Sequence, residues 1–161
     1  MRITNRISVA RSGRALLLSA FCVLLPASAF ADTDHIFRSY EEARQALIKG
    51  SIPDIQKAAK HIAVSAHSAD QHAIAEKAAA LEKENDLESA RLAFAALTEE
   101  VIKYRETRCC DRPAVAYCSM EKKSWLQPAG EIGNPYVDAS MRKCGEIKSP
   151  AREKQGGGHV H

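Results

Sequence analysis

The chain has 161 residues and a formal net charge of +3. Four of its positive charges, Arg2, Arg6, Arg11 and Arg14, lie in the first 14 residues, so the remainder of the chain carries a formal charge of −1. This balance excludes the strongly basic surface of a nucleic-acid-binding protein. The 130 residues that follow Ala31 suit one domain with its own hydrophobic core.

Residues 1–31 have the pattern of a cleaved secretory signal peptide. The four arginines precede the apolar run "ALLLSAFCVLLP" from Ala15, and the small residues "AFA" end at Ala31. The apolar run reaches only about 11 residues before Pro26, whereas a membrane span needs about 20. We therefore expect a periplasmic protein with no membrane span after processing, whose cysteines meet an oxidising compartment.

The segment from Ile36 to Arg108 carries apolar residues at helical spacing and few strand formers. Short breaks divide it into about four helices, which predicts an antiparallel helical bundle. The expected helix starts are Ser51 with Pro53 in the first turn, Ser68 with Gln71 three residues later, and Asn85 or Asp86 before Leu87.

After Arg108 the helical period stops, and "AVAYC" is typical of extended chain. In an extended segment Cys118 and Met120 point to the same side. A turn at Asn134 and Pro135 follows, and then a helical turn in which Met141 and Cys144 share one face. The predicted fold is therefore all-α: a bundle domain over residues 32–148, with an irregular Cys/Met-rich segment packed on it.

The sulfur atoms of this segment suit a soft-metal site. Thiolate and thioether ligands select monovalent copper over magnesium, calcium or manganese. Cys118, Met120, Met141 and Cys144 are the candidate ligands.

Two other interpretations of the cysteines stay open. In the first interpretation, Cys118 and Cys144 form a disulfide that closes a loop of about 27 residues, while the methionines fill core gaps. Such a disulfide contributes about 3.5 kcal/mol to the free energy of unfolding. Cys109 and Cys110 form a redox pair in the second, although adjacent cysteines have poor geometry for a bond. Either of these neighbours is also a candidate partner for Cys118 or Cys144.

The order of motifs in residues 117–146 resembles that of a known family. The residues that carry the resemblance are Tyr117, Cys118 and Met120, then Trp125 and Leu126, then Asn134, Pro135 and Tyr136, and finally Met141, Cys144 and Gly145. The family consists of small exported helical domains of unassigned function. It also occurs fused to the C-terminus of periplasmic adaptor subunits of heavy-metal (copper/silver) efflux pumps.

The resemblance implies that the Cys and Met pairs bind copper or a similar soft ion, and that a heavy-metal efflux adaptor or another envelope protein is a partner. Residues 149–161 are expected to form a flexible Gly/His tail, in which His159 and His161 supply an auxiliary metal site.

Sequence motifs of common enzymes are not found. The chain lacks an "HExxH" motif and a phosphate-binding loop, and no Ser, His and acid constellation emerges. The sequence therefore predicts a periplasmic metal-binding protein without enzymatic activity. The alternative is a disulfide-stapled module that binds another protein and no metal.

Overall fold

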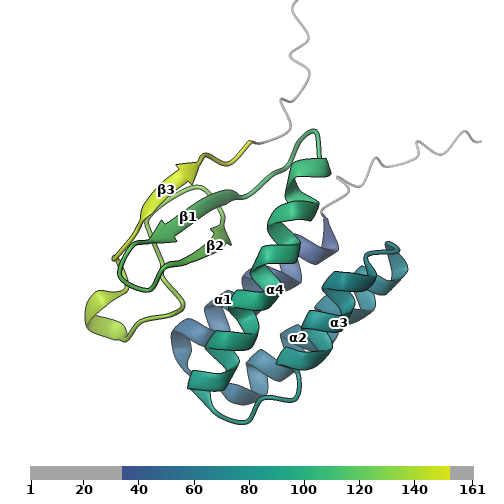
Figure 1. Cartoon of the computed structure of the whole chain (residues 1–161), viewed down its shortest axis with the longest axis horizontal. Coiled ribbons are helices and arrows are strands. Elements are labelled where there is room, and N and C mark those ends of the chain that lie inside the picture. The colour runs from purple at the N-terminus through teal and green to yellow at the C-terminus, as the bar shows by residue number, and fades with distance from the viewer. Residues whose placement is uncertain (1–33, 153–161) are drawn as a thin grey trace, which may run out of the picture. The chain divides into compact units, whose positions relative to one another are not determined.

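The computed structural model describes residues 34–152, which form four helices followed by three strands (Figure 1). The predicted signal peptide (1–31), together with His159 and His161, lies outside these residues. The helices are α1 (His35–Lys49), α2 (Ile52–Ser68), α3 (His72–Leu81) and α4 (Leu87–Thr107), and the strands are β1 (Ala114–Cys118), β2 (Lys123–Gln127) and β3 (Glu146–Ser149). None of the helices in the described residues is long and apolar enough to cross a membrane.

Side-chain caps and a glycine fix the helix ends. The Asp34 carboxylate accepts hydrogen bonds from the first free N–H groups of α1, and Asp86 does the same for α4. Gly50 ends α1 in the left-handed conformation, at φ 73°, which glycine adopts without a steric cost. Ser51 and Pro53 then begin α2, as the sequence predicts.

The helices bury an alanine-rich core around a few large side chains. Successive helices pack on one another and α1 also contacts α4. Tyr40 of α1 and Phe94 of α4 stack with their ring centroids 4.7 Å apart, and both are fully buried. The prediction of four helices is confirmed.

The prediction of an all-α fold is wrong, because β1, β2 and β3 form an antiparallel sheet in the order β2-β1-β3. The extended conformation predicted for "AVAYC" is confirmed as β1. The other two strands lack a period-two pattern: β2 ends in three consecutive buried residues, and β3 is almost wholly exposed. Their pairing with β1 rests on long-range contacts that local sequence does not show.

A buried hydroxyl cluster joins the sheet to the helices. The Tyr40 hydroxyl lies 2.6 Å from Thr98 Oγ1 of α4 and accepts a hydrogen bond from the backbone N–H of Leu126 in β2. The hydroxyl of Tyr136, in the loop before β3, lies 3.4 Å from the same Thr98 oxygen and donates to the Ser124 carbonyl. These bonds satisfy polar groups that burial would otherwise leave unpaired.

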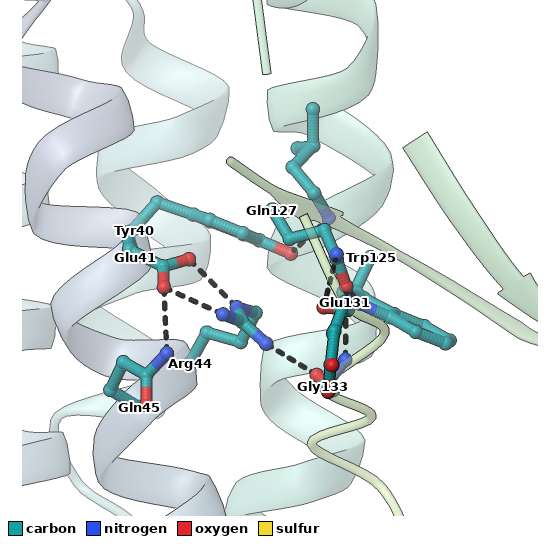
Figure 2. Close-up of polar contacts among 9 residues, drawn as sticks. Tyr40, Glu41, Arg44, Gln45, Trp125, Gln127, Glu131 and Gly133 are labelled. Atoms are coloured by element: carbon teal, nitrogen blue, oxygen red, sulfur yellow. Dashed lines mark hydrogen bonds and ion pairs between the residues drawn. The ribbon is translucent and has the colours of Figure 1, made fainter. Parts of the chain in front are cut away.

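Arg44 fixes the loop that follows β2 (Figure 2). Its guanidinium donates to the Gly133 carbonyl and pairs with Glu41 one turn earlier in α1. Gln127 holds the other side of this loop, since its side-chain oxygen accepts from Trp125 Nε1 and from the Gly133 N–H. The chain after β2 is therefore attached to α1 before it reaches Cys144.

Ordered structure continues past residue 148, where the predicted domain ends. β3 reaches Ser149, and Arg152 exchanges two backbone hydrogen bonds of 2.8 Å with Arg112. The buried Arg105 of α4 donates to Ser149 Oγ and to the Pro150 carbonyl. The C-terminal strand is thereby tied to the end of α4.

Candidate metal centre

Cys118 is the last residue of β1 and faces the core. Ala114, Ala116 and Cys118 are buried, while Val115 and Tyr117 between them are half-buried, which is the alternation of a strand with one covered face. The Cys118 side chain is fully buried. Its sulfur therefore lies at the edge of the core, where the sheet gives way to a turn.

Cys144 lies opposite Cys118, 26 residues later in the chain. Their sulfur atoms are 3.1 Å apart, beyond the roughly 2.05 Å of a disulfide bond, and both thiols are free. Cys144 follows a single 3-10 turn, η1 (Ala139–Met141), and its N–H donates to the Met141 carbonyl at 2.8 Å. The long-range fold thus creates a thiol pair that the sequence predicted only as a possibility.

Met120 adds a third sulfur. The Cys144 thiol donates to Met120 Sδ at 3.8 Å, and the Met120 side chain is 63% exposed. The prediction that Cys118 and Met120 lie in one extended segment is wrong. β1 ends at Cys118, and Met120 lies in the turn before β2. The turn nevertheless brings the thioether to the pair and leaves it open to solvent.

The two thiols differ in proton affinity. Burial raises the pKa of the Cys118 thiol, but four hydrogen-bond donors outweigh burial and hold that pKa below its ordinary value. The donors are the backbone N–H groups of Glu121 and Met120, the Cys144 thiol and the side-chain amide of Asn134. The hydrogen bond with Cys118 raises the pKa of Cys144, with burial and the negative charges of Cys118 and Glu121 acting in the same direction.

These shifts set the order in which the two thiols lose their protons. Cys118 is the residue that becomes a thiolate first, and Cys144 keeps its proton to higher pH. The Cys144 proton then faces two sulfur acceptors, Cys118 Sγ at 3.1 Å and Met120 Sδ at 3.8 Å. Cys144 Sγ therefore lies at the centre of a cluster of three sulfur atoms.

Asn134 is a site residue whose role the sequence did not reveal. It is fully buried, and its side-chain amide donates to the Cys144 carbonyl at 2.9 Å as well as stabilising the Cys118 thiolate. Its side-chain oxygen accepts from the Tyr136 N–H, which makes the turn after Asn134 an Asx turn. The "NPY" motif signalled the turn, but the contact of its amide with both cysteines depends on the tertiary fold.

Gly145 lets the chain pass directly over Trp125. Its φ is 140°, and a Cβ at this position would lie 2.6 Å from Trp125 Cη2 and 3.1 Å from the Tyr117 carbonyl. A side chain is excluded there by both backbone conformation and space. The close approach holds the neighbouring Cys144 against the sheet.

Met141 joins the site through its main chain. η1 ends at Met141, so the helical face that it was predicted to share with Cys144 does not extend that far. Its carbonyl accepts the Cys144 N–H, while its side chain is 38% exposed. The sulfur contacts of Cys144 therefore bring together three of the four predicted sulfur ligands, Cys118, Cys144 and Met120.

The histidines and acids give no comparable cluster. Within residues 34–152, no group of three or more His, Cys, Asp or Glu side chains is placed to hold a metal ion. His67 and His72 do approach each other across the turn from α2 to α3, with ring centroids 5.9 Å apart. The sulfur cluster differs from such sites because a thioether supplies its third donor.

Cys109 and Cys110 form a separate thiol pair. Their sulfur atoms are 2.8 Å apart in the loop between α4 and β1. The sequence left open a pairing of either neighbour with Cys118 or Cys144. In the structure Cys109 lies against Cys110, and Cys118 lies against Cys144.

Comparisons of this chain with protein-family models, with curated proteins and with solved structures find no match. The resemblance to exported domains of metal efflux systems therefore remains an expectation from the motifs.

Proposed function

We propose that this chain is a periplasmic protein that binds a monovalent soft metal ion, copper foremost, for sequestration, delivery or efflux support. Cys118, Cys144 and Met120 are the ligands, on a scaffold that we interpret as an antiparallel helical bundle with an attached sheet. Thiolate and thioether donors favour such an ion over harder divalent cations.

The observation that carries the proposal is the approach of three sulfur atoms. Cys144 Sγ lies 3.1 Å from Cys118 Sγ and 3.8 Å from Met120 Sδ, and neighbouring N–H groups stabilise the thiolate form of Cys118. A monovalent ion placed between these atoms meets three sulfur donors. When Cys118 is a thiolate and Cys144 a thiol, the ion replaces one proton and leaves the net charge of the cluster unchanged.

The sulfur spacing supports a three-coordinate ion. With metal–sulfur bonds of about 2.3 Å, three donors in a plane lie about 4.0 Å apart. Cys144 and Met120 are already 3.8 Å apart, whereas Cys118 and Cys144, at 3.1 Å, must separate by roughly 0.9 Å. Because Cys144 is only half-buried, rotation of its side chain can supply this movement.

Exposure of Met120 favours transfer of the ion over permanent storage. A partner protein that offers thioether or thiolate ligands can reach an ion through the exposed Met120 side. We propose a heavy-metal efflux adaptor or another envelope protein for this role, with His159 and His161 as an auxiliary site. The predicted signal peptide supports a periplasmic location.

The second candidate is a disulfide-stapled interaction module. It is favoured by the same 3.1 Å approach of Cys118 and Cys144, since modest movement would bring the sulfur atoms within bonding distance. A chain oxidised in this way loses both thiolate ligands and with them the metal.

An anaerobic competition titration tests the proposal. The reduced protein is titrated with monovalent copper against a chromophoric chelator, beside a Cys118→Ser, Cys144→Ser variant, and free thiols are counted in a periplasmic extract. We expect tight binding by the parent chain, its loss in the double variant, and free thiols in the extract. A Cys109→Ser, Cys110→Ser variant is the matched control and should keep the tight site. Failure to compete with the chelator, together with paired Cys118 and Cys144, would support the stapled module instead.

A further inference from the structure

A second pair of thiols lies at the end of α4, where the proposed copper site makes no use of it. Cys109 Sγ and Cys110 Sγ are 2.8 Å apart, Cys109 is exposed and Cys110 is half-buried. Both side chains stand in a loop of six residues between α4 and β1. An incoming reagent can therefore reach the pair from solvent.

The loop is anchored on both sides of the cysteines. Before them, the Arg108 N–H donates to the Arg105 carbonyl, and the Arg108 guanidinium lies 3.5 Å from the Asp34 carboxylate. After them, Arg112 exchanges two backbone hydrogen bonds of 2.8 Å with Arg152. Since so few residues separate the two anchors, the two thiols have little freedom to move apart.

Closure of the pair into its own disulfide is disfavoured by backbone geometry. The described residues contain no cis peptide bond, so the two Cα atoms are about 3.8 Å apart. Disulfides usually need about 4.4 to 6.8 Å between Cα atoms. The pair therefore resists oxidation to an internal bond, even in an oxidising compartment, and stays available to a ligand that bridges both sulfur atoms.

The sulfur spacing selects the geometry of that ligand. With bonds of about 2.3 Å, an ion that binds two sulfur atoms in a line needs them about 4.6 Å apart, whereas a centre with bonds at right angles needs about 3.3 Å. The observed 2.8 Å is closer to the second value. Trivalent arsenic has this geometry, because its lone pair keeps its three bonds close to right angles.

We propose that Cys109 and Cys110 form a second thiol site that captures trivalent arsenic compounds, independently of the copper site. The reaction is a condensation without oxidation or reduction. With an organic arsenic(III) oxide, two arsenic–sulfur bonds form while the arsenic–oxygen double bond and two S–H bonds break, and the two thiol protons leave with that oxygen as one water molecule. Arsenic stays trivalent throughout.

Phenylarsine oxide, which condenses with two close thiols, is the probe. It is added anaerobically to the full chain carrying Cys118→Ser and Cys144→Ser, so that only the second pair can bridge it. Bound arsenic is measured by intact mass and free thiols with a chromogenic reagent. We expect one phenylarsenic group per chain, the loss of two titratable thiols, and full reversal by a small dithiol.

Adding Cys109→Ser to that variant is the matched control, and it should abolish the stable adduct while leaving Cys110. In the parent chain, the same Cys109→Ser change should lower the uptake by one equivalent, which tests the site without the two substitutions in the sheet. Persistence of both thiols after addition of the probe, or isolation of the pair already oxidised, would overturn the proposal. Neither outcome affects copper binding at Cys118 and Cys144, so the two proposals fail separately.

Discussion

At the scale of single residues, the two thiols of the proposed copper site have different tasks. Cys118 is fully buried and its thiolate is stabilised by N–H donors, so it anchors the ion from the side of the core. Cys144 is half-buried and keeps its proton to higher pH. In the proposed site, a metal ion would therefore replace the proton of Cys144.

This difference predicts the pH dependence of copper affinity. The pKa of Cys118 is lowered and that of Cys144 is raised, so in the window between them only the Cys144 proton must leave when the ion binds. Affinity should rise about tenfold per pH unit in that window, more steeply below it and not at all above it. Chelator competition across a pH series gives the slope. A slope of about two through the whole range would contradict the separation of the two pKa values.

The two methionines should behave differently. Met120 Sδ lies 3.8 Å from Cys144 Sγ, whereas Met141 accepts the Cys144 N–H through its carbonyl. We expect Met120→Leu to weaken binding of monovalent copper about tenfold, equivalent to about 1.4 kcal/mol, and the matched Met141→Leu change to have little effect. Equal losses in the two variants would show that Met141 is a fourth ligand, as the sequence predicted.

At the scale of elements, Gly145 shows how a turn sets the position of Cys144. Gly145→Ala should lower the free energy of unfolding by about 3 kcal/mol, because the Cβ meets both Trp125 and the Tyr117 carbonyl in addition to the strain of a positive φ. Urea denaturation measures the change. Gly130→Ala is the matched control, since φ is 133° there and nothing lies within 4 Å of the added Cβ.

Gly130→Ala should lower the free energy of unfolding only by the cost of the positive φ, about 1 kcal/mol. If the two glycine variants were equally stable, the close approach of Gly145 to Trp125 would not hold Cys144 in place. A stable Gly145→Ala protein with unchanged copper affinity would also show that this close approach does not position Cys144.

Helix boundaries could be predicted where the residue at the boundary has a single common role, such as a proline in the first turn or an aspartate as N-cap. Pro53 and Asp86 stand at the helix starts that their chemistry predicted. Ser68 was predicted to cap α3, but it is the last residue of α2, and its hydroxyl donates to the Val64 carbonyl four residues earlier. A serine hydroxyl can cap the start of a helix or donate to a carbonyl one turn earlier, and the packed structure selects between the two.

At the scale of the whole molecule, the sheet is the part that sequence patterns did not predict. β1 has an alternating pattern, but β2 and β3 acquire strand structure by pairing with it. The geometry of the candidate site was likewise not predictable from local sequence patterns. The sulfur-bearing residues could be selected by type and spacing, whereas the approach of Cys118 to Cys144 depends on how the chain returns to β1 after Asn134.

The importance of the C-terminal strand can be tested by truncation. A chain ending at Lys148 loses both bonds from Arg105 to residues 149 and 150 and both backbone bonds between Arg112 and Arg152. We expect its free energy of unfolding to fall by about 3 kcal/mol, since each bond contributes about 0.5 to 1.5 kcal/mol. A chain ending at Lys154 is the control and should match the parent. Equal stability of the two truncated chains would contradict the role of this strand.

The most direct test of the proposed copper site is the number and type of atoms around a bound copper ion. X-ray absorption at the copper edge, on a Cys109→Ser, Cys110→Ser variant loaded anaerobically with one equivalent of monovalent copper, measures both. The proposed site predicts three sulfur neighbours at about 2.3 Å, reduced when Met120 is replaced by leucine. A first shell of nitrogen or oxygen, or a sulfur shell that persists after Cys118→Ser and Cys144→Ser, would contradict it.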